Sequence, residues 1–303
     1  MELRHLRYFL AAAKAQNFTL ASNRLFITQP TLSHQIKQLE DELGVALFTR
    51  IGRSVHLTAA GELFRTYATR ALQDVELGRE ALNDMQNLKH GHLTLGVLAS
   101  FGTLTLPSIL ADFNAAYPGI KITVLRLRSG EIEKRLLDGE LNLGVANTPA
   151  RSDQIDVYPL IDDPLALLVG DGHPLAHCAS IALSDIEKHS LVLLTPEYSS
   201  RQLIDASFAA NGIVPRIMME MNAIEPILST VRLGSMATVL SAALAKPWVG
   251  LHAIKITPTV VRTVAFFTRR NSILPAAAQA LSEAIRQHVS SVQQPICAEI
   301  RSR

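Results

Sequence analysis

The chain has 303 residues, of which 48% are hydrophobic, and its formal net charge at pH 7 is +2. This length suffices for one large domain or two of ordinary size, and the hydrophobic share predicts a substantial core rather than wholesale disorder. The small net charge disfavours a polycation that coats nucleic acid indiscriminately, although it allows a local basic surface.

The two cysteines, Cys178 and Cys297, lie far apart and lack a metal-type spacing, which fits a reducing compartment. The apolar run near the N-terminus is too short and too interrupted by charge for a signal peptide. No stretch approaches the roughly 18 uncharged apolar residues that cross a bilayer. We therefore expect a cytoplasmic protein with no membrane partner.

Two short helical patterns open the chain. Apolar residues recur at helical spacing from Leu3, which predicts a first amphipathic helix. Asn17 and Phe18 interrupt the pattern, and Thr19 is then the expected N-cap of a second helix that ends at Leu25.

A third helix follows a short turn. Thr28 can cap it, Pro30 fits its first turn, where a missing N–H is harmless, and Gly44 ends it. Its narrow apolar face is expected to consist of Leu32, Ile36, Leu39 and Leu43. The next residues, 47–58, form two short extended pieces around Gly52 and predict a β-hairpin wing.

The outward face of the third helix carries hydroxyls, an imidazole, amides and one cation. Such groups suit the reading of base edges, whereas the basic side chains would neutralise phosphates and make affinity fall with salt. The residues expected to contact DNA are Gln29, Pro30, Thr31, Ser33, His34, Lys37 and Gln38 on the helix, with Arg50 and Arg53 on the wing. The alternative is a solvated polar helix face.

Residues 59–88 contain no proline and predict one continuous helix. Its apolar seam comprises Ala60, Phe64, Tyr67, Ala71, Val75, Gly78, Leu82 and Met85. A seam of that length favours a dimerisation helix, although a helix packed on its own domain would have the same pattern.

Beyond the polar hinge at 89–91, β-rich runs alternate with helices, which predicts helix-covered α/β sheets. The pattern occurs twice, so two lobes with a small-molecule cleft between them are expected. We predict a DNA-binding domain at 1–58, a linker helix at 59–88 and an effector domain at 89–303. Within the latter, one lobe comprises 89–161 with 268–303, and the other 162–267.

The stretch 18–61 resembles the N-terminal signature of LysR-type transcriptional regulators. The elements QPTLS, QLEDELG, LF-T-R and LTAAG occur in order and at family spacing, and weaker similarity covers the whole chain. Within the family, the effector domain is weakly similar to the cyanate-operon regulator. The resemblance implies a winged helix-turn-helix, a linker helix that mediates dimerisation, and a two-lobed α/β effector domain like a periplasmic binding protein.

The resemblance also implies a dimer of dimers whose binding or bending of promoter DNA is modulated by a small molecule, with RNA polymerase as a further partner. We expect that molecule to be a small polar or anionic metabolite in the cleft. Many relatives have a second glycine and a proline around 234–241, both absent here, which limits any transfer of their ligands.

Loops after the cleft strands supply the expected effector contacts, because small polar groups and free N–H groups at helix starts suit an anion. These residues are Ser100, Gly102, Thr103, Ser129 and Asn147 from the first lobe, with Thr195 and Asn222 from the second. Ordinary helix capping or turn formation is the alternative for each.

Two other classes of function remain open from the sequence. An enzyme is disfavoured because the chain lacks a P-loop, a strand-linked GxGxxG and a GxSxG elbow, so we expect neither catalysis nor a cofactor. An architectural DNA protein would not need the large second domain. His173, His177 and Cys178 form an incomplete ligand set, so no metal site is expected.

Overall fold

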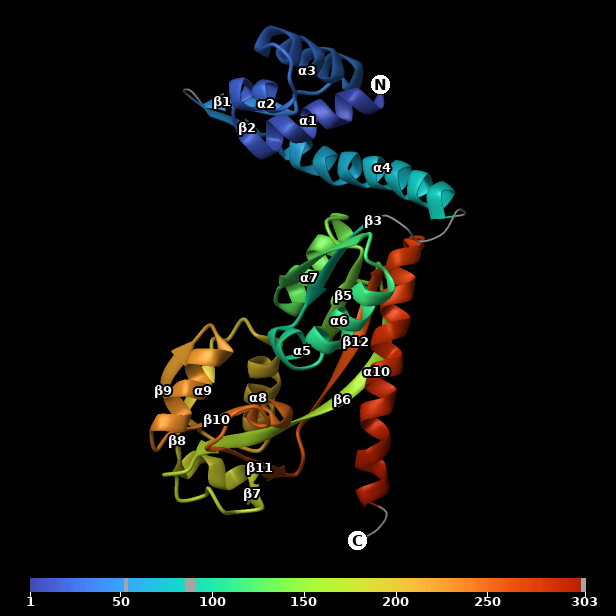
Figure 1. The fold of residues 1–303 in the computed structure, drawn as a ribbon. Coiled ribbons are helices and arrows are strands. Elements are labelled where there is room, and N and C mark those ends of the chain that lie inside the picture. Colours follow the sequence, from blue (N-terminus) through green and yellow to red (C-terminus); the bar gives the residue numbers. More distant parts are fainter. Residues whose placement is uncertain (52–53, 85–90, 301–303) are drawn as a thin grey trace. The chain divides into compact units, whose positions relative to one another are not determined.

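The computed structural model describes residues 1–51, 54–84 and 91–300. They form two compact units, one built mainly on residues 1–84 and the other mainly on residues 91–300 (Figure 1). Among these residues, no helix combines the length and the apolarity that crossing a membrane requires.

The N-terminal unit is a helical domain with a two-stranded hairpin. Its elements are α1 (Leu3–Ala15), α2 (Phe18–Arg24), α3 (Gln29–Leu43), β1 (Phe48–Ile51), β2 (Ser54–Leu57) and α4 (Ala59–Asp84). The expected cap of α2 was wrong: the side chain of Asn17, rather than Thr19, accepts a hydrogen bond from Leu20 N at 2.9 Å. The caps of α3 are confirmed, with Thr28 at its start and left-handed Gly44 at its end.

Phenylalanine rings build the core of this unit. Phe9 of α1 is fully buried, and its ring centroid lies 5.4 Å from that of Phe48 and 5.1 Å from that of Phe64. Three of the four expected α3 core residues are buried, whereas Leu43 is 37% exposed, because the last turn of α3 lies outside the core cluster.

Helix α4 divides its apolar residues between two faces. Ala60 and Phe64 pack against the core of their own unit. This agrees with the alternative interpretation, in which the helix packs on its own domain. Tyr67, by contrast, is 60% exposed, and Leu63 is 64% exposed. Residues 85–88 of the expected helix lie outside the described part of the chain.

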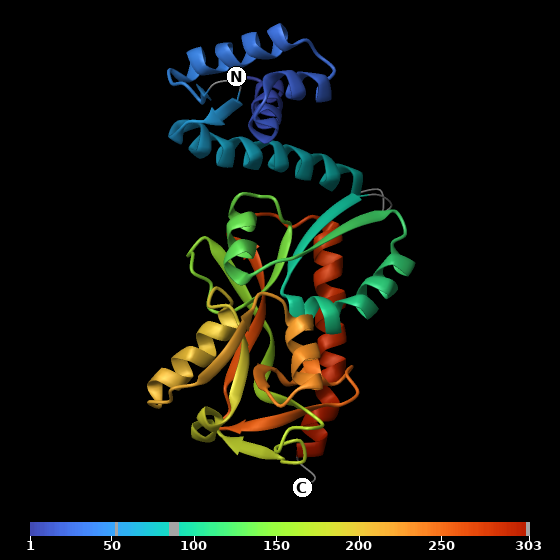
Figure 2. The same ribbon diagram turned by 90° about the vertical axis from the view of Figure 1, so that its left-hand side faces the viewer.

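Lobe I of the C-terminal unit has a sheet in the order β4-β3-β5-β12-β6, with the first three strands parallel. Its elements are β3 (Gly91–Val97), α5 (Ala99–Leu104), α6 (Leu106–Ala116), β4 (Ile120–Arg126), α7 (Ser129–Leu137), β5 (Leu143–Asn147), part of β6 (Ile155–Gly170), β12 (Val261–Arg269) and α10 (Ala276–Ile300). Both ribbon views show α10 running along this unit (Figures 1 and 2).

Lobe II continues from the second part of β6, which pairs with two further strands. Its elements are β7 (Ser180–Ala182), η1 (Leu183–Lys188), β8 (Ser190–Leu194), α8 (Ser199–Ala210), β9 (Arg216–Met221), α9 (Ile224–Leu233), β10 (Ala237–Ser241), η2 (Ala242–Ala245) and β11 (Leu251–Thr257). Strand pairing makes the chain pass between the lobes at 164–165, within β6, and at 260–261, just before β12, so two chain segments connect them.

The core of lobe II follows the two-residue period of β6. Leu165 and Leu167 face one side of the sheet together with Phe208 of α8, whereas Leu168 faces the other side with Val231 of α9. Both faces of the strand are therefore buried, which explains its continuous apolar run.

Candidate nucleic-acid interface and interlobe cavity

The outward face of α3 is a polar surface, and Thr28 caps the start of this helix. Gln29 and Ser33 are half-buried, and Gln29 Nε2 donates a hydrogen bond to Ser33 Oγ at 2.8 Å. The remaining predicted residues of this helix are exposed, namely Pro30, Thr31, His34, Lys37 and Gln38. One face therefore offers donors, acceptors and a cation, as base and phosphate contacts need.

Glu40 connects α3 to the hairpin. Its carboxylate accepts hydrogen bonds from the backbone N–H groups of Leu47 at 2.7 Å and Phe48 at 3.1 Å. This contact fixes where β1 begins relative to the helix. Arg50 lies on β1, but its side chain and the whole of Arg53 fall outside the described residues, so their predicted phosphate contacts stay predictions.

A small cavity of about 30 Å³ lies between the two lobes of the C-terminal unit. Its lining residues are Leu98, Ala99, Ser100, Leu127, Arg128, Ser129, Asn147, Leu194, Tyr198, Ser199, Ser200, Ile224 and Arg262. The volume is enough for about two water molecules. At this cavity the two lobes therefore lie close together.

Three polar side chains join the lobes at this cavity. Asn147 Nδ2 of lobe I donates to Ser199 Oγ of lobe II at 2.7 Å, and Ser129 Oγ lies 3.3 Å from the same oxygen. Ser129 Oγ also accepts a hydrogen bond from Asn147 N at 3.2 Å. Asn147 Oδ1 is buried without a hydrogen-bond partner in the described structure. A buried acceptor of this kind marks a place for a donor group.

A buried ion pair forms another wall of the cavity. Arg262 Nε lies 2.8 Å from Asp163 Oδ2, and its Nη2 donates to Ser100 Oγ at 2.8 Å. Ser241 Oγ in turn donates to Asp163 Oδ1 at 2.6 Å. Hydrogen bonds on both sides of the pair offset part of the cost of burying its charges.

Three helices of at least nine residues begin at the cavity. Ser129 starts α7, Ser199 starts α8, and Ile224 starts α9. The first N–H groups of a helix have no partner within it, and the helix dipole places partial positive charge there. These helix starts therefore direct partial positive charge towards the cavity, whereas the charge of Arg262 is offset by Asp163.

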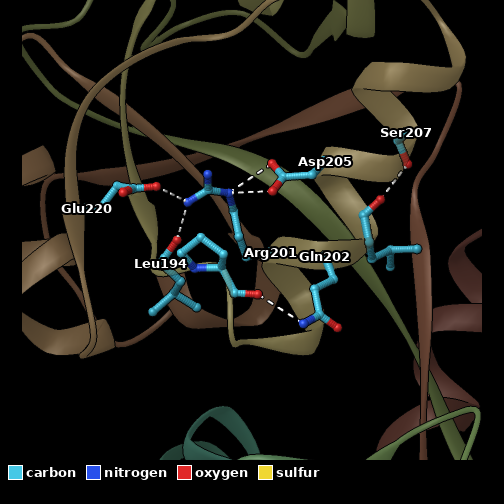
Figure 3. A network of polar contacts seen from close by, with 8 residues as sticks. Leu194, Arg201, Gln202, Asp205, Ser207 and Glu220 are labelled. Atoms are coloured by element: carbon cyan, nitrogen blue, oxygen red, sulfur yellow. Dashed lines mark hydrogen bonds and ion pairs between the residues drawn. The ribbon is translucent and has the colours of Figure 1, made fainter.

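Arg201 anchors the first turn of α8, as the close-up in Figure 3 shows. Its Nε lies 2.8 Å from both carboxylate oxygens of Asp205, and its Nη1 donates to Leu194 O at 2.5 Å and to Glu220 at 2.6 Å. Because Leu194 ends β8 and Glu220 lies on β9, this network fixes α8 to two strands. It thereby positions Ser199 at the cavity.

Two further ion pairs connect the lobes at their rims. Arg126 lies 3.0 Å from Glu225, and Arg128 lies 3.4 Å from Glu197. Burial acts to raise the pKa of Glu225, but hydrogen bonding to Arg126 and the charge of Arg126 leave that pKa below its usual range. The Arg126–Glu225 pair is therefore intact at neutral pH and weakens as the pH falls through that pKa.

The structure brings Ser100, Ser129 and Asn147 together at the cavity, and four other predicted effector contacts do not line it. Gly102 abuts the Val97 side chain instead, since an added Cβ would lie 3.0 Å from it. Thr103 and Asn222 are exposed, and Thr195 lies just beyond the cavity-lining end of β8.

Sequence reasoning missed Arg262, Ser199 and Ser200 as cavity residues. Arg262 had a visible signal, since it is a charged residue beside the apolar run of β12. The two serines were missed because no sequence signal marked Ser199 as the first residue of α8. No group of three or more metal-ligating side chains suited to an ion occurs among the described residues.

Comparison with known families decides what this arrangement is. Residues 3–62 match the bacterial regulatory helix-turn-helix protein, lysR family, and residues 86–290 match the LysR substrate binding domain. The chain belongs to the LysR family of transcriptional regulators. The family assignment, the helix-turn-helix and the effector-binding domain expected from the sequence are thereby confirmed, and the family is one of regulators rather than enzymes.

Individual relatives are similar to this chain over most of their length. The Hca operon transcriptional activator HcaR of Escherichia coli is 35% identical over 242 residues, covering 79% of this chain and 81% of that protein. A full-length OxyR variant of Pseudomonas aeruginosa has a TM-score of 0.78 at 27% identity, covering 94% of this chain and 95% of its own. CbnR in complex with its target DNA has a TM-score of 0.68 at 25% identity, covering 95% and 100%. The similarity to the cyanate-operon regulator stays a prediction.

Proposed function

We propose that this LysR-family regulator reads a promoter site through α3 and that a small anionic metabolite between its lobes changes this binding or the bend of the DNA. The observation that carries the effector half is the convergence of three helix starts on a closed cavity beside Arg262. Helix N-termini are established anion sites.

The unpaired acceptor, Asn147 Oδ1, limits which kinds of compound can be the effector. Asn147 Oδ1 is buried without a partner, and an anion alone would not satisfy it. A compound with both a carboxylate and a hydroxyl or amine donor would satisfy the helix starts and Asn147 together. We therefore propose a small hydroxy or amino carboxylate.

Binding requires the lobes to separate. A cavity of about 30 Å³ holds water but no such carboxylate. The effector would replace the direct Asn147–Ser199 hydrogen bond with contacts of its own. It therefore favours a more open lobe arrangement, and it shifts that population only by its differential affinity for the two states.

Calorimetric titration with a panel of small hydroxy, amino and unsubstituted carboxylates tests this proposal. Ser200→Ala removes a hydroxyl from the cavity without breaking the Asn147–Ser199 bridge, and should weaken binding of the best compound about fivefold. Ser207→Ala is the matched control on the same helix, where the hydroxyl bonds Leu203 O away from the cavity. Equal affinities of the two variants would refute the site, and chemical conversion of the bound compound would favour an enzyme.

Footprinting of genomic fragments selected by the purified protein tests the DNA half of the proposal. A dimer of dimers presents several reading heads, so protected half-sites one helical turn or a multiple apart are expected. Salt-sensitive binding without a preferred sequence would instead favour an architectural protein. Recruitment of RNA polymerase to the protected promoter is a further expectation of the same proposal.

Two substitutions on α3 locate the reading face. His34→Ala should cost about 1–3 kcal/mol of operator affinity if the imidazole contacts a base edge. Lys37→Ala should reduce the salt dependence of binding by about one phosphate contact. Lys14→Ala removes the same charge from exposed α1 and is the control. Operator binding that is equal in all three variants and the parent would show that α3 does not read the site.

A further inference from the structure

The C-terminal unit contains a second and much larger cavity. Its volume is about 1060 Å³, against about 30 Å³ between the lobes. It also lies where the lobes meet, and it is bordered by β6, by η2 and β11 of lobe II, and by α5 and α10 of lobe I. The two cavities share none of the lining residues that the structure describes. A concavity of this size is of the order that holds small molecules.

Apolar side chains form most of the wall. Phe101 comes from α5, Trp248 and Leu251 from lobe II, and Val289 from α10. Leu251 and Val289 are buried, whereas Trp248 is only half-buried beside the open space. An aromatic side chain in such a position offers a flat surface to a ring.

Nitrogen-bearing side chains gather at the same cavity. His177 and His252 have ring centroids 6.1 Å apart, and His252 Nε2 lies 2.7 Å from Asp171 Oδ1, which holds the second imidazole in place. Lys246 extends from the end of η2, and His288 comes from α10. All four side chains can donate hydrogen bonds to an oxyanion.

Of the two carboxylates on the wall, Asp163 is offset by a cation, whereas Asp162 keeps its charge and is held by a neutral hydroxyl. Asp163 is paired with Arg262, and Asp162 Oδ1 accepts a hydrogen bond from Thr263 Oγ1 at 2.7 Å. Lys246 is exposed, and its side chain forms no hydrogen bond or ion pair with the part of the chain that the structure describes. A ligand with an apolar ring and one negative group therefore matches both halves of the wall.

We propose that this cavity is a second ligand site, which binds a small aromatic or alicyclic carboxylate. The ring lies against Trp248 and Phe101, and the carboxylate accepts hydrogen bonds from Lys246 and the His177–His252 pair. This site is separate from the interlobe cavity, and its occupancy does not depend on the effector proposed there.

Trp248 provides a local reporter because it is the sole tryptophan of the chain. Titration of the full-length protein with 2-naphthoate should change Trp248 emission in a saturable way, with a Kd on the order of 100 µM for a ligand of this size. Equilibrium dialysis under the same conditions should give one bound molecule per chain. A change in Trp248 emission that does not saturate with rising 2-naphthoate concentration would overturn the proposal.

Ala243→Phe and Lys246→Met separate the two halves of the site. Ala243→Phe places a ring inside the cavity and should weaken 2-naphthoate at least tenfold. Lys246→Met should weaken 2-naphthoate about fivefold but leave the neutral 2-naphthamide unchanged. Lys255→Met is the matched control, because Lys255 is exposed on β11 but does not line the cavity. Far-UV circular dichroism and operator binding verify that each variant is folded.

Three results would overturn the assignment. Loss of 2-naphthoate binding in Ser200→Ala but not in Ala243→Phe would locate the probe between the lobes. Equal loss in Lys246→Met and Lys255→Met would show a general charge effect. A fall in oligomer mass with Ala243→Phe, without altered probe binding, would show that a second copy of the chain occupies this surface.

Discussion

Phe26 combines two features that rarely occur together. It lies in the turn between α2 and α3, its φ is 55°, and it is 95% exposed. A bulky side chain in the left-handed region costs on the order of 1 kcal/mol, and no burial of the ring offsets that cost. The helix-turn-helix turn is therefore strained at this residue.

Phe26→Asn should relieve the strain, because asparagine tolerates left-handed backbone better than other non-glycine residues. Phe26→Ala is the matched control, since it also removes the ring but keeps a poor left-handed residue. The asparagine variant should be about 0.5–1 kcal/mol more stable than the alanine variant in urea unfolding. Equal midpoints for the two would show that the turn is unstrained. If both variants lose operator affinity, the ring itself contributes to DNA binding.

The positions of single side chains were harder to predict from the sequence than the elements or the lobes. Ser100, Ser129 and Asn147 were found because each follows a strand that ends at the cavity. Thr195 and Asn222 follow strands in the same way but do not line it. Position after a strand thus fixes the edge of the sheet, whereas small rotations of the chain decide which side chains face inward. Only the folded structure contains that information.

Among the helices and strands, α4 requires a glycine, Gly61, for the close packing of its first turn. A Cβ at Gly61 would lie 2.1 Å from Leu47 O, a backbone atom that cannot move aside. Thr58 Oγ1 accepts from Gly61 N at 3.0 Å and donates to Ala46 O at 2.7 Å, which ties the helix start to the chain before β1. The glycine of the LTAAG motif is therefore required for this close approach.

Gly61→Ala should destabilise the N-terminal unit by several kcal/mol, because backbone would have to shift. Gly78→Ala on the same helix is the control, with nothing within 4 Å of the added Cβ. The latter should instead stabilise the helix by up to about 1 kcal/mol. Denaturant midpoints measured on the full chain compare the two. Similar midpoints would mean that the close approach at Leu47 is relaxed in solution.

Periodicity predicted most elements, and its failures have physical reasons. In β11 the alternation of buried and exposed residues begins only at Ile254, so the run was too short to give a strand signal. Met218 and Met219 are apolar residues of β9 and yet are exposed, and β9 is the last strand of its sheet. The pattern of apolar residues reports local burial, whereas sheet order is set by contacts between distant segments.

At the scale of the molecule, two chain segments connect the lobes and a few polar contacts hold them together. β6 passes through both lobes, the chain crosses between them a second time just before β12, and the Asn147–Ser199 hydrogen bond with the rim ion pairs spans the cleft. Such a connection permits hinge motion, because the two segments need only bend near 164–165 and 260–261. Alternating α/β patterns predicted the two lobes, but no sequence pattern reports how far they are closed.

A regulator of this kind must obey linkage between its two ligands. If the effector changes operator affinity by some factor, the operator must change effector affinity by the same factor, typically about 5–150-fold. Operator Kd should be measured with and without the best carboxylate, and carboxylate Kd with and without operator DNA. Ser200→Ala should weaken effector binding equally in both states and leave the factor unchanged, because it removes a contact rather than a conformational preference. If the effector leaves operator affinity unchanged, effector control is refuted. If the effector changes operator affinity by a different factor from that by which the operator changes effector affinity, a third equilibrium, such as subunit assembly, contributes to the response.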